Sequence, residues 1–182
     1  MPDWLYARNE LIRRGAVYVG VTAQRVGVTA AVAREPDRYG LAAANLVHPD
    51  DSFSYDIFSQ AGEAVLDNQT LLLGGKIARA VIAAGESQSA SRMLTYVNAV
   101  HPVVDVFDGF LVHSRGSTGS ALRQAPLAAI ATPGPNRSRT DLGVPVLGVQ
   151  AATRRPLSSS STPCEARWRS RCREFFPRAT SA

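Results

Sequence analysis

Cysteine and long apolar runs are scarce in this chain of 182 residues. The two cysteines, Cys164 and Cys172, are too few for a disulfide-dense secreted scaffold or a structural zinc cluster built on cysteines. No run reaches about 18 apolar residues, so we expect no membrane span. No signal-peptide pattern opens the chain, which leaves its location open, with the cytoplasm as the default. A hydrophobic share of 45% and a charged share of 19% indicate a globular domain.

An excess of acidic residues is also lacking, and the net charge is +5. Seven arginines and two glutamates lie in residues 151–182, so this tail carries the whole excess. Of the 20 basic and 15 acidic residues, 13 of each remain in residues 1–150, which are therefore neutral overall. We expect no nucleic-acid partner. The remaining nucleic-acid hypothesis, binding through the tail, predicts a steep salt dependence that disappears when the tail is deleted.

The composition changes after Gln150 and divides the chain in two. Residues 151–182 combine a serine run with an alternating arginine pattern and have neither helical nor strand periodicity. We predict a basic, disordered extension there, after a domain over residues 1–150. The abrupt change also resembles the product of a shifted reading frame.

Residues 1–150 are typical of alternating helices and strands. We predict helices over residues 8–14, around 57–65 and over 88–101, where Gly15, Gly74-Gly75 and Pro102 end them. We predict buried strands over 16–21, 79–84, 110–112 and 144–149, and a loop over 114–141. Unbroken apolar strands separated by helices indicate an α/β fold with an open, mostly parallel sheet flanked by helices.

The segment VIAAGESQSA at residues 81–90 contains the candidate catalytic residues. It leads a buried strand into a helix through Gly85-x-Ser87-x-Ser89, which is typical of a nucleophile elbow. Small residues are needed two positions either side of the serine, because backbone segments crowd there. The backbone N–H of Gln88 would then donate to a developing oxyanion. The alternative interpretation is that Ser87 only caps the helix.

Five segments share their pattern with a known family. They are residues 14–24 (RGAVYVGVTAQ), 55–61 (YDIFSQA), 85–90 (GESQSA), 107–116 (FDGFLVHSRG) and 139–150 (RTDLGVPVLGVQ). Over residues 4–150 the chain resembles a poorly characterised family of α/β-hydrolase domains whose elbow reads G-x-S-Q-S-A. The resemblance implies an α/β-hydrolase fold, Ser87 as the nucleophile, and esterase-like chemistry on a small ester-like substrate.

The chain departs from that family's pattern at both ends. In the order serine, acid, histidine, the acid would follow the strand that ends at Gln150, where this chain has Ala151-Ala152-Thr153. No histidine comes later, and the family's early strands and first oxyanion loop would lie before residue 1. We therefore expect a central fragment of a hydrolase, truncated at both ends.

Other polar residues are candidate substitutes for the missing groups. His113 ends a strand and is within reach of the catalytic edge; we interpret it as a residue of the pocket wall, with a general base as the alternative. The remaining polar residues have structural or pocket interpretations. We interpret Asp105, Asp108, Asp141 and His48 as loop residues, the three aspartates at the amino edge of the sheet, and His101 as a helix-end residue. We expect a structural or pocket role for Glu86, a loop-pairing or solvated position for Arg92, and a place in the pocket wall for Gln24. The histidines lack metal-ligand spacing, so we expect neither a metal nor another cofactor.

Two functions from different classes remain. The leading hypothesis is a serine hydrolase that forms an acyl-enzyme on Ser87. The alternative is a non-catalytic pseudo-hydrolase or fragment that binds a ligand or partner. Because the acid and histidine are missing, we expect this chain to be nearly inert toward simple activated esters. A burst abolished by Ser87→Ala would instead indicate His113 as a substitute base. The oligomeric state is left open.

Overall fold

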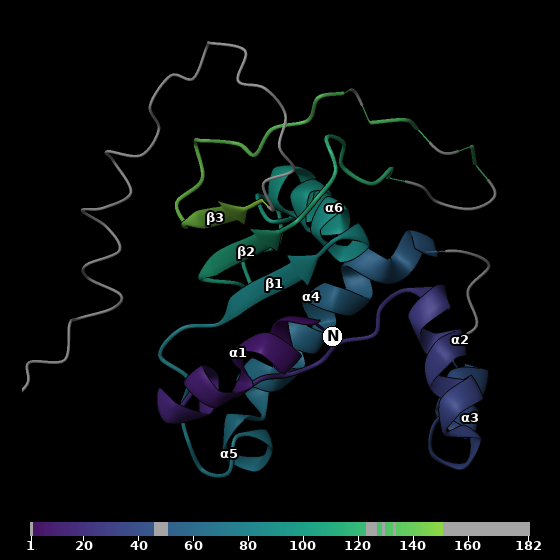
Figure 1. Ribbon diagram of the computed structural model, residues 1–182, viewed down its shortest axis with the longest axis vertical. Coiled ribbons are helices and arrows are strands. Elements are labelled where there is room, and N and C mark those ends of the chain that lie inside the picture. Colours follow the sequence, from purple (N-terminus) through teal and green to yellow (C-terminus); the bar gives the residue numbers. More distant parts are fainter. Residues whose placement is uncertain (1, 46–50, 123–126, 129, 133, 151–182) are drawn as a thin grey trace, which may run out of the picture. The chain divides into compact units, whose positions relative to one another are not determined.

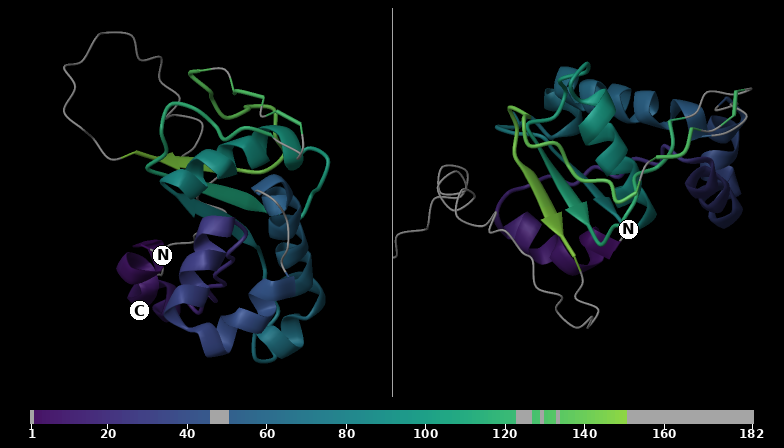
Figure 2. Two further views of the ribbon diagram at one scale, coloured as in Figure 1. Left: turned by 90° about the vertical axis from the view of Figure 1, so that its right-hand side faces the viewer. Right: turned by 90° about the horizontal axis from the view of Figure 1, so that it is seen from above.

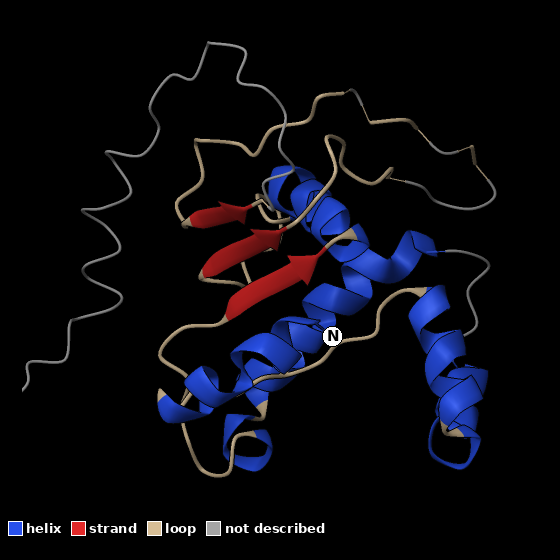
Figure 3. Cartoon of the chain, viewed as in Figure 1, coloured by secondary structure: helices blue, strands red, loops and turns tan. Residues whose placement is uncertain are grey.

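Three short parallel strands form the sheet of this computed structural model, which describes residues 2–45, 51–122, 127, 128, 130–132 and 134–150. The strands are β1 (Ile82–Glu86), β2 (Gly109–His113) and β3 (Val146–Val149), in the order β1-β2-β3 (Figures 1 and 3). Both pairings are parallel, as the unbroken apolar runs predicted. All three carboxyl ends therefore lie at one edge of the sheet.

Six α-helices and two short helical turns accompany the sheet within the described residues. They are α1 (Pro2–Arg13), α2 (Arg25–Arg34), α3 (Pro36–Asn45), the 3-10 turn η1 (Asp51–Phe53), α4 (Ser54–Asp67), α5 (Gln69–Leu72), α6 (Gln88–Thr95) and the π-helical turn η2 (Tyr96–Val100). The helix predicted over residues 88–101 is thus formed by α6 and η2 together. The predictions missed α2, α3 and α5. Gly15 has a positive φ angle after α1, as expected of a residue that ends a helix. Gly74 and Gly75 also have positive φ angles, but they follow α5 and not the helix predicted around residues 57–65, which ends at Asp67.

The core lies between one face of the sheet and the helices α4 and α6. Alternate strand residues, Ala83, Phe110 and Val112, are buried on this face, as are Met93 and Val97 on the helical side. Val97 is fully buried, and burial of a side chain of this size contributes roughly 1.5–3 kcal/mol. The register Ala83↔Phe110 and Gly85↔Val112 brings these residues to the same face.

Aromatic rings fill the same core. The ring centroids of Phe58 and Phe107 are 5.1 Å apart, and those of Tyr96 and Phe107 are 5.7 Å apart. The Tyr96 hydroxyl is hydrogen-bonded to Ser59 Oγ on α4 at 2.7 Å, so the buried phenol keeps a partner. A β-carbon on Gly62 would lie 2.8 Å from the Phe107 ring, which explains a glycine in the middle of α4.

The opposite face of the sheet meets α1 (Figure 2). Asp3, in the first turn of α1, contacts His113 at the end of β2. Trp4 packs on Tyr18, with ring centroids 5.2 Å apart. Ile82, on this face of β1, is still 52% exposed, so the face is only partly covered.

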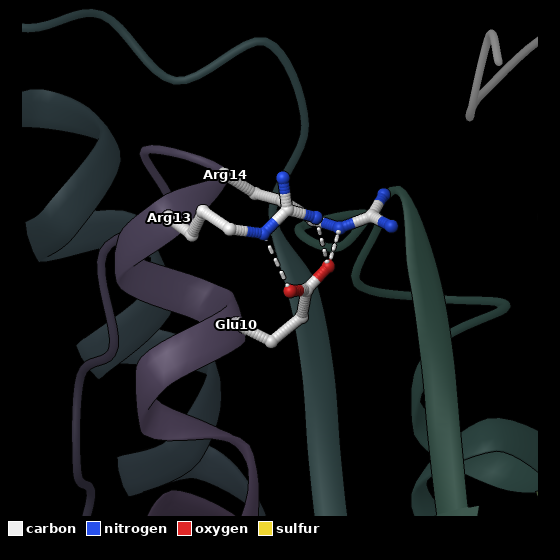
Figure 4. Close-up of polar contacts among 3 residues, drawn as sticks. All are labelled: Glu10, Arg13 and Arg14. Carbon is white, nitrogen blue, oxygen red and sulfur yellow. Dashed lines mark hydrogen bonds and ion pairs between the residues drawn. The ribbon is translucent and has the colours of Figure 1, made fainter. Parts of the chain in front are cut away.

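Glu10, one turn before the C-terminal end of α1, forms ion pairs with the two arginines that follow it (Figure 4). Its carboxylate accepts two hydrogen bonds from Arg13, at 2.7 and 2.8 Å, and one from Arg14. Hydrogen bonds from Arg13 and Arg14 lower the pKa of Glu10 to about 2. The cluster is solvent-exposed, so it contributes little to stability in spite of that low pKa.

The strand predicted over residues 16–21 is not formed. These residues are extended but pair with no strand in the described part of the chain, and Val17 and Val19 are about half exposed, at 50% and 48%. A β-branched run becomes a strand only where a neighbour takes up its backbone N–H and C=O groups. The sequence shows the β-branched run, but it does not show whether a neighbouring strand is present to pair with it.

The described residues of the segment that joins β2 to β3 are mostly irregular, as its glycine, serine, threonine and proline content predicted. It is attached to α6: Ser120 N–H donates to the Ser91 carbonyl at 3.1 Å, and the Thr95 hydroxyl donates to the Ser120 carbonyl at 2.6 Å. No helix among the described residues has the length and apolar character needed to span a membrane. The tail predicted over residues 151–182 lies outside the described residues.

Candidate active site

Ser87 is the single residue between the end of β1 at Glu86 and the start of α6 at Gln88. Figure 1 shows the turn that joins these two elements. Its backbone has φ 56° and ψ −116°, a combination that residues with a β-carbon rarely adopt. The structure gives it no side-chain capping hydrogen bond, and a helix-capping serine ordinarily has an extended backbone. The geometry is therefore that of a strained, sharp strand-to-helix turn and not that of an ordinary N-cap.

Hydrogen bonds on both sides hold this strained backbone. The Ser87 N–H donates to the carbonyl of His113 on β2 at 3.0 Å, and the Ser87 carbonyl accepts from Ser91 N–H at 3.2 Å. Strain of this kind costs on the order of 1–3 kcal/mol and persists only where the surroundings enforce it. The sheet and the first turn of α6 together supply that enforcement.

Gly85 makes the sharp turn possible. A β-carbon there would lie 2.7 Å from the carbonyl oxygen of Ser89 and 3.1 Å from the backbone nitrogen of Ala90. Both atoms belong to the first turn of α6, so a side chain at Gly85 would push the helix away from the strand. This close approach is the crowding that the spacing of small residues around Ser87 predicted.

Gln88 is the first residue of α6, and its backbone N–H directly follows Ser87. The first N–H groups of a helix have no acceptor within the helix and carry the positive end of its dipole. A developing negative charge beside Ser87 would therefore meet an N–H donor from this turn.

His113 and Ser114 end the neighbouring strand at the same edge. His113 is the register partner of Glu86, and its Nδ1 lies 3.0 Å from Oδ1 of Asp3. The side chains are 32% and 22% exposed, so this contact is partly shielded from water. Ser114, like Ser87, has a positive φ of 53°, and its N–H donates to the carbonyl of Val149 at 2.7 Å. Each of these two adjacent strands is thus followed directly by a serine with a positive φ angle.

Arg92, one turn into α6, joins that helix to η1 and α4. It donates from Nη1 to Ser54 Oγ at 2.8 Å and from Nη2 to Asp51 Oδ2 at 3.0 Å. The other oxygen of Asp51 accepts the backbone N–H of Arg25, the first residue of α2, at 2.6 Å. This is the loop-pairing role expected for Arg92. Gln24 directly precedes Arg25, and its Nε2 is buried without a hydrogen-bond partner among the described residues.

The aspartates considered as substitutes lie away from the Ser87 edge. Asp108 Oδ2 accepts the Val81 N–H at 2.7 Å at the amino end of the sheet, and Asp141 pairs with Arg139 at 2.7 Å. Hydrogen bonding from Arg139 lowers the pKa of Asp141 to about 2. Asp105 is 88% exposed beside His101.

The other two histidines differ from His113. His101 is buried after η2, with its ring edge-on to Phe110 at 4.9 Å, so it is a core residue as well as a helix-end residue. His48 lies outside the described residues. Within the described ranges, no three histidine, cysteine or carboxylate side chains gather as a metal site would require.

A family model described as "Alpha/beta hydrolase domain" matches residues 1–174. The chain belongs to this family. The match agrees with the parallel sheet flanked by helices and with the resemblance seen over residues 4–150, and it continues past the expected domain boundary at residue 150. That boundary stays a prediction. No curated protein matches the chain, and no solved structure does.

Sequence reasoning missed the partners of two site residues. Asp3 lies 110 residues before His113, and no local pattern marks it as a histidine partner. Asp51 is likewise separated from Arg92 by 41 residues. The positions of Ser87 and Gln88 were open to prediction because both belong to one continuous strand-to-helix segment, and that of His113 because it ends a predicted strand.

Proposed function

We propose that this chain has the acyl-transfer centre of an esterase-like serine hydrolase, with Ser87 as the nucleophile. The observation that carries the proposal is the strained backbone of Ser87, φ 56° and ψ −116°, on a turn between a parallel strand and a helix. Such a turn lifts a serine above the carboxyl edge of the sheet, where a substrate carbonyl can approach it.

Two further observations support this role. The turn is kept tight by Gly85, whose close approach to Ser89 leaves no room for a side chain. The first N–H groups of α6 lie beside the serine, and an oxyanion donor of this kind is worth roughly 10²–10³-fold in rate. Membership of an α/β-hydrolase family agrees with this chemistry without specifying the substrate.

In the proposed reaction, the Ser87 hydroxyl loses its proton and attacks an ester carbonyl, the alcohol leaves, and water then releases the acid from the acyl-enzyme. We expect slow turnover. No carboxylate follows β3 before residue 151, so an acid in the family's usual place is not among the described residues. A nucleophile without its full set of partners retains only part of its rate.

The test is the pre-steady-state hydrolysis of p-nitrophenyl acetate. The sequence alone predicts near inertness toward this ester. Because Ser87 lies on a strained turn beside the first N–H groups of α6, we instead expect a burst of p-nitrophenol of about one equivalent per chain, followed by slow turnover, and no burst from Ser87→Ala. Ser89→Ala is the matched control, because this exposed serine lies two residues away on α6 and should keep the burst. A burst of equal size in Ser87→Ala would refute the proposal, and no burst in any form would favour the non-catalytic alternative.

A further inference from the structure

The helices α2 and α3 form a hairpin that has little share in the core. They lie side by side (Figures 1 and 2) and pack chiefly on each other. No residue of α2 is buried, and none of residues 36–41 of α3 is buried. Val26 and Leu41 are 62% and 85% exposed. Most helices in proteins are stabilised by an apolar face packed on the core, so the order of this hairpin has another source.

The start of α2 also lacks the groups that ordinarily stabilise a helix. Its ten residues include a glycine and several β-branched side chains, which disfavour a helix. Its N-cap residue, Gln24, makes no side-chain capping hydrogen bond, and its first turn holds no acidic residue. The first N–H groups of a helix need acceptors and favour a nearby negative charge. By itself, a helix of this length and composition is marginal.

Asp51 supplies both missing groups from a distant part of the chain. Its Oδ1 accepts the N–H of Arg25, the first residue of α2, at 2.6 Å, so its negative charge lies at the positive end of that helix. Its Oδ2 accepts from Nη2 of Arg92 at 3.0 Å. Arg92 belongs to α6, donates to Ser54 Oγ at 2.8 Å and lies over the ring of Tyr55, so two buried residues of α4 hold it in place.

We propose that Asp51 is a latch that keeps α2 folded, and that release of this latch unfolds α2 while the core stays intact. The hairpin is then a conditional element, whose folding is coupled to α6 through the ion pair of Asp51 with Arg92. The side chains of Arg92 and Asp51 are 21% and 23% exposed, so salt screens this pair less than a surface pair. The inference goes beyond the proposed role of Ser87 and does not depend on it.

The latched state is poised to open. Gln24, next to Arg25, and Arg92 each have a buried side-chain nitrogen, Nε2 and Nε, without a hydrogen-bond partner in the described part of the chain. A buried N–H without an acceptor favours a state in which water reaches it. Because α2 buries no residue, its opening exposes little apolar surface. Segments with few buried apolar contacts are those that unfold locally.

The test is native-state hydrogen exchange of the full chain, measured by mass spectrometry on peptides from α2, β1 and β2. Loss of a capping carboxylate ordinarily shifts a helix equilibrium by roughly 5–30-fold, so Asp51→Ala should speed exchange in α2 by about that factor. Exchange in β1 and β2 should keep its wild-type rate. Asp51→Asn, which keeps an acceptor but loses the charge, should give a smaller increase. Asp56→Ala is the matched control, because this exposed carboxylate accepts a hydrogen bond from Gln60 within α4.

Arg92→Ala distinguishes a latch from an independent stabilising contact. It should also speed exchange in α2, because Asp51 loses its anchor, but it should add nothing in α2 when Asp51 is already alanine. Wild-type exchange in α2 of Asp51→Ala would overturn the proposal, and so would an equal increase in β1 and β2. A full additional effect of Arg92→Ala in the double variant would show that the two residues do not act through each other. None of these results bears on Ser87, because no ester is hydrolysed.

Discussion

A β-carbon added to Gly85 would lie only 2.7 Å from the carbonyl oxygen of Ser89. The strand that ends before Ser87 and the helix that begins after it therefore touch backbone to backbone. This contact, and not the serine itself, determines how sharply the chain turns.

Gly85→Ala should be strongly destabilising for this reason. The new methyl group must displace the first turn of α6 or bend β1, and forced overpacking of this kind costs roughly 1–3 kcal/mol. Urea unfolding measures the change in the free energy of unfolding. Gly148→Ala is the matched control, because a β-carbon at this strand glycine meets no atom within 4 Å. Equal stability of Gly85→Ala and Gly148→Ala would show that strand and helix are not in close contact.

Ser87→Gly should be more stable than Ser87→Ala. Alanine keeps the β-carbon that makes φ 56° unfavourable, whereas glycine adopts positive φ readily. Relief of about 1–3 kcal/mol of strain, less about 0.5–1 kcal/mol for the greater freedom of glycine in the unfolded chain, leaves a gain of about 1 kcal/mol.

The control for that comparison is Ser91, inside α6. There the same pair of substitutions should have the opposite order, since glycine in a helix interior is about 1 kcal/mol less favourable than alanine. Chemical denaturation of the four variants checks both orders. If Ser87→Gly is the less stable of its pair, the turn is not strained.

The parts of the fold that could be predicted are those determined by residues close together in the sequence. The strand-to-helix segment around Ser87 was predictable because its glycine, its apolar strand and its helical stripe are all local. The strand expected over residues 16–21 was wrong because strand formation depends on a neighbour. α2 was missed because it has no buried residue and hence no apolar stripe. The Asp3–His113 contact was not predictable, because no pattern in either segment refers to the other.

Alkaline pH should destabilise the core through its buried tyrosines. Burial raises the pKa of both Tyr55 and Tyr96 above 10.0. A group whose pKa is raised by folding contributes stability below its unfolded pKa, and this contribution is lost as pH rises toward the folded value. The free energy of unfolding should thus be nearly level from about pH 7 to 9 and fall above about pH 10.

In Tyr96→Phe, the free energy of unfolding should fall less steeply at alkaline pH than in the wild type. At neutral pH it should be about 1 kcal/mol lower, because the hydrogen bond to Ser59 is lost. Tyr6→Phe is the matched control, because this tyrosine is 86% exposed and lies outside the buried core. Urea unfolding at several pH values gives both results. If the free energy of unfolding falls as steeply above about pH 10 in Tyr96→Phe as in the wild type, Tyr96 is not the cause of that fall.

The most direct measurement of the central claim is covalent labelling of the nucleophile. The chain is incubated with a fluorophosphonate, which reacts with activated serines, and the adduct is located by mass spectrometry of its peptides. We predict one adduct per chain, on Ser87, absent from Ser87→Ala and retained in Ser89→Ala. A chain that stays unlabelled, or an adduct on another residue that persists in Ser87→Ala, would contradict the assignment of Ser87 as the nucleophile.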